Sequence, residues 1–445
     1  MDKIRTRFAP SPTGEMHIGS LRTALYSYAL AKHDGGDFIL RIEDTDKKRE
    51  VKGSRSKIKK QLKLFGLDWD EYYEQSERKK EGIYKKQAEK LISEGHAFYC
   101  QCKPKDPKKS YSKVLRDPCR DKGFNKGAIK LRMPDNEKIG FVDFVLGKRV
   151  EWDSSVLADT ALLKSDGFPT YHLAVVIDDY DMKITHVLRG HDWMPSTPIH
   201  LLVYKYLGHK VPEIGHLTDI LDPQGGKLSK RKGTTNVSEF INKGYLPDAI
   251  LNFVMLLGWA PKDNREMYGL DKFVGVFDVK GLQIANPTFN IKKLDWFSGE
   301  YIRKMDNEKL ADTINVFYKD KYPKEQIESI TPLVKERIST LQDFYSLAGF
   351  FFKPKKFKIG YFEKDWKKHL KDAFNVLSRL KTWDKDSIDK ALIKLVKSKG
   401  YHTGNFFMNL RVAITGSRAT PPINESLVIL GRKETLDRLN NAVVL

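Results

Sequence analysis

IRTRFAPSPTGEMHIGS, residues 4–20, is the stretch from which the fold can be predicted. A short strand over 4–8 runs into a turn stiffened by Pro10 and Pro12, and a helix then begins near residue 18. Its apolar positions share one helical face, and the polar, Gly-containing run 33–36 ends it. Residues 38–42 are apolar apart from Arg41, a pattern typical of a buried parallel strand. The first 42 residues therefore predict a strand–helix–strand unit.

The same patterns predict the elements farther along the chain. Helical periods cover 48–65 and 79–93, and residues 96–170 are irregular and rich in Lys, Asp, Pro and Gly. Short strands are expected at 173–177, 183–188 and 216–221. From about Val237 the chain is mainly helical, with predicted helices over 249–258, 333–352, 366–380 and 387–398. The fold class is α/β in the first half and all-α in the second.

Length and charge narrow the possible functions. The chain has 445 residues, enough for two to four domains, and a formal net charge of +21. The last 145 residues hold 28 Lys and Arg against 17 Asp and Glu. This charge indicates a polyanionic partner such as nucleic acid, although a merely lysine-rich protein explains it equally well at this point. We expect no membrane span and no secretory signal, and three Cys in all favour a reducing compartment.

Polar side chains gather where the predicted parallel strands end, which is where open α/β sheets bind ligands. A helix N-terminus favours phosphate, and the predicted helix begins at His17 and Gly19. Three cations lie in a Gly-flanked stretch, Lys227-Leu228-Ser229-Lys230-Arg231, and suit a pyrophosphate leaving group. Alone, each of these features is more often a cap or a solvated turn. Neither a Walker A loop nor a dinucleotide fingerprint is present.

Taken together, three motifs resemble those of one family. RFAPSPTGEMHIG (residues 7–19), RIEDTD (41–46) and KLSKR (227–231) are similar to motifs of the bacterial glutamyl-tRNA synthetases, a family of class I aminoacyl-tRNA synthetases. Residues 17–20 match its HIGH signature and 227–231 its KMSKS signature. The resemblance continues through 169–174, 189–190 and 196–198 to RVAITG (411–416), and so covers essentially the whole chain.

The resemblance implies an ATP-dependent attachment of L-glutamate to tRNA(Glu) through glutamyl-adenylate. It assigns glutamate to Arg7, Ala9, Ser11, Glu43, Tyr171 and Arg189. It assigns ATP, with Mg²⁺, to His17, Gly19, Ser20, Asp192, Lys227, Leu228, Ser229, Lys230 and Arg231, of which His17, Lys227 and Lys230 are the catalytic residues. Two positions depart from the family pattern near this pocket, Val175 and His191.

The resemblance also implies the domain plan. A Rossmann-like catalytic domain (1–95 and 172–232) carries an inserted acceptor-end-binding subdomain (96–171). A stem-contact domain (233–305) and a helical anticodon-binding domain (306–445) follow. A cytoplasmic monomer is expected.

All three cysteines lie in one window, Cys100, Cys102 and Cys119, with Asp121 two residues beyond the last. Some members of the family bind structural zinc here on three Cys and a His. With Asp121 at the His position, a Cys₃Asp zinc site is the favoured interpretation. A zinc-free insertion with ordinary thiols is the alternative.

Specificity for the tRNA is open. In discriminating members of the family an Arg checks the last anticodon base and rejects tRNA(Gln). The matching segment here is Leu347-Ala348-Gly349-Phe350, which puts Gly349 at the Arg position. One hypothesis is relaxed specificity, with tRNA(Gln) also charged. The competing interpretation is a shifted helix in which Lys353 or Lys355 makes the check. The run 350–352 of three Phe is interpreted as core.

Two other functions fit the sequence less well. A truncated paralogue that glutamylates queuosine on tRNA lacks the helical second half that this chain has. A degenerate, non-enzymatic RNA-binding protein is disfavoured because His17, Gly19, Glu43, Lys227 and Lys230 are intact.

Overall fold

The computed structural model describes residues 3–102, 115–228, 235–354 and 356–444. They divide into two compact units. The first comprises Met1–Phe240 and Ile250–Ile291, and the second Ile241–Ala249 and Lys292–Leu445.

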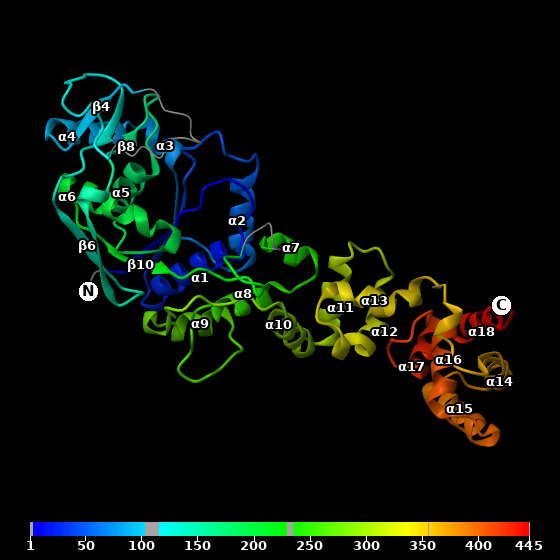
Figure 1. Cartoon of the computed structure of the whole chain (residues 1–445). Helices are drawn as coiled ribbons and strands as arrows, with labels where there is room; N and C mark the ends of the chain where they lie inside the picture. Colours follow the sequence, from blue (N-terminus) through cyan, green and yellow to red (C-terminus); the bar gives the residue numbers. More distant parts are fainter. Residues whose placement is uncertain (1–2, 103–114, 229–234, 355, 445) are drawn as a thin grey trace. The chain divides into compact units, whose positions relative to one another are not determined.

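Two sheets with parallel strands form the centre of the first unit (Figure 1). One pairs β1 (Arg5–Phe8), β2 (Asp37–Ile42) and β3 (Glu71–Glu74) in that order. The other has the order β7-β6-β10-β9, with β6 (Lys138–Asp143), β7 (Lys148–Asp153), β9 (His186–Gly190) and β10 (Glu213–Leu217). In it only the β6–β7 pair is antiparallel.

Hydrogen bonds between Arg5 and Thr185 join the two sheets beside β1. The amide of Thr185 donates to Arg5 O over 2.9 Å, and the amide of Arg5 donates to Thr185 Oγ1 over 2.8 Å. The combined order is then β3-β2-β1-β9-β10, and the direction of chain progression reverses between β1 and β9. Such a reversal opens a crevice at the carboxyl ends of the strands, and side chains that follow β1, β2 and β9 meet there.

Helix α1 (Ile18–His33) is buried on more than the one face that its apolar period predicts. A second face packs against α9 (Leu270–Val276), where the Tyr26 ring lies 6.3 Å from that of Phe273, centroid to centroid. The Tyr26 hydroxyl donates to Leu257 O over 3.1 Å. Helix α1 is thus clamped on two sides, which fixes its N-terminus. The other helices and 3₁₀ turns of the first unit are α2 (Ser54–Leu64), α3 (Gln75–Lys80), α4 (Ile83–Ser93), η1 (Ser154–Val156), η2 (His191–Ser196), α6 (Thr197–Leu207) and η3 (Val279–Gly281).

One predicted strand is wrong. Residues 173–177 lie inside helix α5 (Tyr171–Asp181). Leu173, Ala174, Val175, Val176 and Ile177 are all buried, because α5 packs against α4, α6 and β8 (Thr160–Leu163) at once. A helix buried all round loses its polar face, so its short apolar run is indistinguishable from a buried strand.

The stretch predicted as an inserted subdomain holds a separate antiparallel sheet. Its order is β4-β5-β8, with β4 (Ala97–Cys100) and β5 (Ala128–Leu131). Strands β6 and β7 belong to the same stretch of sequence but extend the sheet that contains β9 and β10. The domain boundaries stay predictions.

The second unit is helical among its described residues. The predicted helices 366–380 and 387–398 correspond to α14 (Trp366–Ser378) and α15 (Lys385–Lys399). The predicted helix 333–352 is broken, because Thr340 and Asp343 form a capping box that starts a new helix, α13 (Leu341–Phe352). Around these lie α10 (Ile291–Lys304), α11 (Asn307–Phe317), α12 (Lys324–Val334), η4 (Lys335–Arg337), η5 (Ile359–Tyr361), α16 (Thr403–Thr415), α17 (Ile423–Leu430) and α18 (Arg432–Val444). Helices α7 (Val237–Asn242) and α8 (Pro247–Met255) cross the division between the units.

The predicted fold class is confirmed: a Rossmann-like parallel sheet followed by helices. No helix in the described ranges is long and apolar enough to cross a membrane.

Gly36 gives a stability test of the α1–β2 connection. A Cβ at Gly36 would lie 2.1 Å from Ile4 O and 2.7 Å from Ala31 O, and backbone cannot move aside cheaply. We expect Gly36→Ala to lower the free energy of unfolding by about 3 kcal/mol. The matched control is Gly275→Ala in α9, where a Cβ meets nothing within 4 Å. It should gain about 0.5 kcal/mol from helix propensity. Chemical denaturation measures both, and equal effects would contradict the close approach at Gly36.

Candidate active site

A cavity of about 520 Å³ lies in the first unit at the ends of β1, β2 and β9. Every predicted site residue that the structure describes lines it, apart from the zinc ligands. They are Arg7, Ala9, Ser11, His17, Gly19, Ser20, Glu43, Tyr171, Arg189, Asp192, Lys227 and Leu228. Ser229, Lys230 and Arg231 lie outside the described residues. The geometry thus brings together segments that are more than 200 residues apart in sequence.

Buried ion pairs hold the acidic and basic groups of β1 and β2. Arg41 is fully buried, and its guanidinium lies 2.6 Å from Asp179 Oδ1 and 3.0 Å from Glu43 Oε1. Asp179 also accepts from Arg7 Nε over 3.1 Å. Burial raises the pKa of Glu43 above its ordinary value, and Arg41 and Arg7 only partly offset this. The Glu43 carboxylate consequently gains from a cationic ligand in the cavity.

His17 is the N-cap of α1, and its Nδ1 accepts from the Ser20 amide over 3.2 Å. A Cβ at Gly19 would lie 3.1 Å from the His17 ring, so Gly19 keeps this ring close to the helix. The first turn of α1 carries no acidic side chain. Amide groups and a positive dipole end therefore face this part of the cavity, as an anion requires.

Lys227 is held between two carboxylates, Asp192 and Asp219, the second at 2.9 Å. Partial burial lowers the pKa of Lys227, but its hydrogen bonds to both carboxylates outweigh burial and raise it. The ammonium of Lys227, the first residue of the KLSKR segment, is therefore charged. Asp219 was not among the predicted site residues, and nothing in its local sequence points to it.

Trp193 and the histidines behind Arg189 are further groups that the sequence patterns missed. The Trp193 ring is 4.1 Å from that of Tyr171, centroid to centroid, and lines the cavity. Arg189 donates to His200, His216 and Thr197, residues of other elements. The two departures from the family pattern are not among the residues that line the cavity: Val175 is buried in the core and His191 is exposed.

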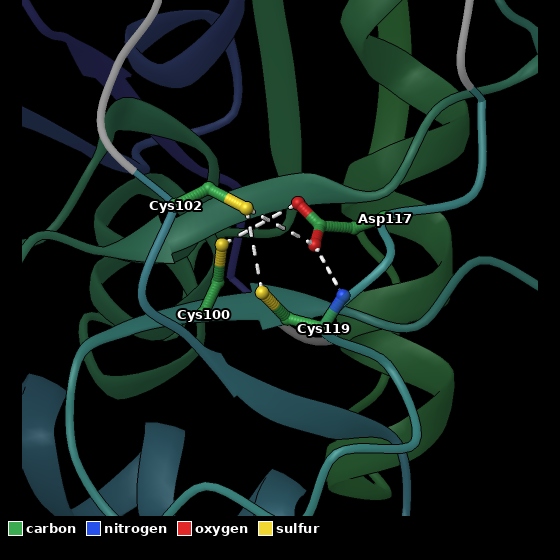
Figure 2. Close-up of side chains that lie close together, drawn as sticks. All are labelled: Cys100, Cys102, Asp117 and Cys119. Atoms are coloured by element: carbon green, nitrogen blue, oxygen red, sulfur yellow. Dashed lines mark hydrogen bonds between the residues drawn. The ribbon is translucent and has the colours of Figure 1, made fainter.

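The three cysteines come together as predicted, but with a different carboxylate (Figure 2). Cys102 Sγ lies 3.4 Å from Cys119 Sγ, and Cys100 Sγ lies 3.4 Å from Asp117 Oδ2. All four donor atoms lie within 4.8 Å of one another. Tetrahedral zinc with Zn–S bonds near 2.3 Å needs sulfurs roughly 3.8 Å apart. The donor set and its spacing therefore fit a zinc ion.

Asp121 is not in this cluster. Its side chain is 86% exposed and pairs with Arg132 over 3.0 Å. Asp117 takes the place because its Oδ1 accepts from the Cys119 amide over 2.8 Å, which folds the carboxylate back toward the thiols. Burial raises the pKa of Asp117, but Lys130 and this amide outweigh burial and lower it to about 2. The prediction of Asp121 as the fourth ligand thus differs from the structure.

In the second unit, Gly349 is buried within α13. A Cβ at this position would lie 3.0 Å from the Tyr345 ring, so a larger side chain here has to displace that ring. Phe350 and Phe351 are buried, as the interpretation of this run as core requires, whereas Phe352 is half-buried. Lys353 is exposed, and Lys355 lies outside the described residues.

Comparison with known families agrees with this geometry. Residues 3–296 match the catalytic domain of "tRNA synthetases class I (E and Q)", and residues 301–443 match an "Anticodon binding domain". The chain belongs to the class I tRNA synthetases of this E and Q family. The family boundary at 296–301 falls near residue 291–292, where the structure passes from the first unit to the second.

Individual members of the family are similar to this chain over nearly the whole length of both chains. Two are called glutamate–tRNA ligases: one from Dehalococcoides mccartyi is 37% identical over 99% of this chain and 98% of its own. One from Finegoldia magna is 35% identical over 100% of both chains. A crystal structure of a glutamate tRNA ligase from Elizabethkingia meningosepticum has a TM-score of 0.84 and 32% identity, and covers 100% of this chain and 99% of its own.

Proposed function

We propose that this synthetase attaches L-glutamate to tRNA(Glu) in two steps. A carboxylate oxygen of glutamate attacks the α-phosphorus of ATP, and the bond to the β-phosphate breaks to release pyrophosphate. A hydroxyl of the terminal tRNA ribose then attacks the acyl carbon of the adenylate, AMP leaves, and the hydroxyl proton passes to solvent. The observation that carries the proposal is the single cavity lined by side chains from β1, β2, α5 and β9 and from the start of α1.

Positioning and charge stabilisation suffice for both steps, because neither requires a covalent enzyme intermediate. We assign the triphosphate to the N-terminus of α1 with His17 and Ser20, and to Lys227. Gly19 leaves room for the nucleoside. Mg²⁺ would arrive with the triphosphate and offset its charge. Lys230 lies outside the described residues, and its catalytic role rests on the family resemblance alone.

Glutamate carries two carboxylates and one ammonium, and the cavity offers groups of matching charge. Glu43, held in place by Arg41, is assigned to the ammonium. Arg7 and Arg189 are assigned to the side-chain carboxylate, since guanidinium groups bind carboxylates through paired, charge-assisted hydrogen bonds. Ala9, Ser11 and Tyr171 complete the subsite.

Three finer points belong to the proposal. Zinc is assigned to Cys100, Cys102, Asp117 and Cys119, where it would hold the window between β4 and β5 together. Relaxed specificity, with tRNA(Gln) also charged, is assigned to the absence of a side chain at Gly349. A cytoplasmic location follows from tRNA as the substrate, and the monomeric state stays a prediction.

Substitution of the two arginines tests the glutamate subsite. We expect Arg189→Ala or Arg7→Ala to raise the glutamate KM about 100-fold, because each removes charge-assisted hydrogen bonds worth roughly 2–3 kcal/mol. The ATP KM should change less than twofold. Arg49→Ala is the matched control, since Arg49 is exposed and pairs with Asp46. Steady-state charging kinetics with an unchanged glutamate KM would remove the assignment.

Metal analysis of washed protein tests the zinc cluster. We expect one zinc per chain in the wild type, and competition with a chromogenic chelator should show about 10- to 100-fold weaker binding in Asp117→Asn. Asp121→Asn serves as control and should bind zinc normally. Absence of stoichiometric zinc refutes the site. Normal binding in Asp117→Asn with loss in Asp121→Asn would return the ligand role to Asp121.

Charging assays with purified tRNAs test the specificity. If Gly349 leaves the last anticodon base unchecked, tRNA(Gln) should be glutamylated within about tenfold of tRNA(Glu), since one bidentate base contact is worth roughly 1–3 kcal/mol. No glutamylation of tRNA(Gln) contradicts this. In that case a gain of tRNA(Gln) charging in Lys353→Ala would assign the check to Lys353.

A further inference from the structure

The partners of Arg189 are unusual for a buried arginine. Its side chain, 6% exposed, donates from Nε to His216 Nε2 over 2.9 Å and from Nη1 to His200 Nδ1 over 3.1 Å. Nη2 donates to Thr197 Oγ1 over 2.8 Å. None of these acceptors is a carboxylate, and no ion pair joins Arg189 to an acidic group in the part of the chain that the structure describes.

Arg7, the other candidate for the same carboxylate, is held differently. Its Nε pairs with Asp179, which also binds Arg41. The charge of Arg7 is therefore shared with a buried acid, whereas that of Arg189 is not. A guanidinium has five N–H groups, and three are used in the short contacts of Arg189. The two left are on Nη1 and Nη2, the pair that binds a carboxylate in bidentate fashion, and the one on Nη1 makes a longer contact of 3.4 Å with the hydroxyl of Tyr171, a residue that lines the cavity.

Asp143 determines which nitrogen of His216 can accept from Arg189. Asp143 Oδ2 lies 2.7 Å from His216 Nδ1, and both side chains are fully buried. Burial raises the pKa of Asp143, but the bonds from His216 and from backbone amides outweigh it and lower the pKa. An ionised carboxylate only accepts, so His216 Nδ1 bears the hydrogen and Nε2 presents its lone pair to Arg189.

His200 likewise accepts a hydrogen bond from Arg189, through its Nδ1 lone pair. With Nδ1 facing Arg189, its hydrogen is on Nε2, which lies 3.2 Å from His172 Nδ1. Burial and the charge of Arg189 lower the pKa of His172 to about 4 and that of His200 well below its ordinary value. Burial also lowers the pKa of His216 below its ordinary value. All three histidines are thus neutral, and His216 and His200 orient the guanidinium without neutralising it.

We propose that Asp143, through His216, is a positioning residue that holds Arg189 in one orientation with its charge uncompensated, and that this arrangement selects glutamate over glutamine. The proposal rests on the proposed function. A side-chain carboxylate receives both remaining N–H groups of Arg189. The glutamine amide offers one acceptor, and its NH₂ group faces a donor, which costs binding free energy.

Asp143→Asn is the most direct test of the positioning role, because the structure determines the orientation of the new side-chain amide. Oδ1 of Asp143 accepts from the amides of Val145 and Leu146 over 2.9 and 3.0 Å. An Asn at this position keeps its oxygen there and turns its NH₂ toward His216 Nδ1. His216 must then carry its hydrogen on Nε2, where it opposes the Nε–H of Arg189.

The expected result is a rise of about 30-fold in the glutamate KM, the equivalent of roughly 2 kcal/mol, with kcat and the ATP KM within twofold. The preference for glutamate over glutamine in kcat/KM should fall by the same factor. His216→Phe, which has no acceptor, should reproduce both effects. His186→Phe, on strand β9 with Arg189, is the matched control and should change neither. Nitrogen NMR of labelled histidine should show the tautomer of His216 change in Asp143→Asn.

Outcomes of the experiment separate the two levels of the proposal. If the wild type fails to charge any tRNA with glutamate, the proposed function is wrong. If the wild type charges tRNA(Glu) but folded Asp143→Asn and His216→Phe keep the wild-type glutamate KM and preference, only the positioning role is overturned. If the variants lose kcat and both KM values together with thermal stability, the role is structural and the proposal is again refuted.

Discussion

The fully buried guanidinium of Arg41 is the interaction on which the site depends. It comes from β2 and binds Asp179 of α5, which also binds Arg7 of β1, and it holds Glu43 at the end of its own strand. Three elements are thereby tied together beneath the cavity. A charge buried this deeply is tolerated only when it is paired and hydrogen-bonded, and removal of one partner typically costs about 3–5 kcal/mol. The same bonds that hold β1, β2 and α5 together therefore place the groups assigned to glutamate.

Sequence patterns predicted the part of this arrangement that depends on neighbouring residues. The strand, turn and helix over 4–33 are visible because apolar period, proline and glycine act locally. The run 173–177 of helix α5 has the pattern of a strand because it is buried on all sides and contains no polar residue. The capping box at Thr340 is a local signal, yet the apolar period on either side of it reads as one continuous helix.

The motifs led to the residues that line the cavity, but not to those that stand behind them. Asp143 and His216 come from β6 and β10, strands that pair only in the folded protein. Neither belongs to a recognisable motif, so no spacing in the chain predicts that one orients the other. The same limit explains Asp117 and Asp121. Both lie two residues from Cys119, and a turn decides which carboxylate faces the thiols.

Arginines are used in two ways around this cavity, and the difference is physical. Arg41 and Arg7 are balanced by acids, so they stabilise the fold and set the geometry. Arg189 is oriented by neutral imidazoles and a hydroxyl, which supply acceptors without supplying charge. An acid in place of His216 would hold the guanidinium more tightly. It would also neutralise the positive charge that attracts the side-chain carboxylate of glutamate. The histidines are buried enough to stay neutral, and burial in a low-dielectric site strengthens the attraction of Arg189 for a carboxylate. Orientation and charge are thus provided by different residues, which is what a subsite must do if it is to separate a carboxylate from an amide of the same shape.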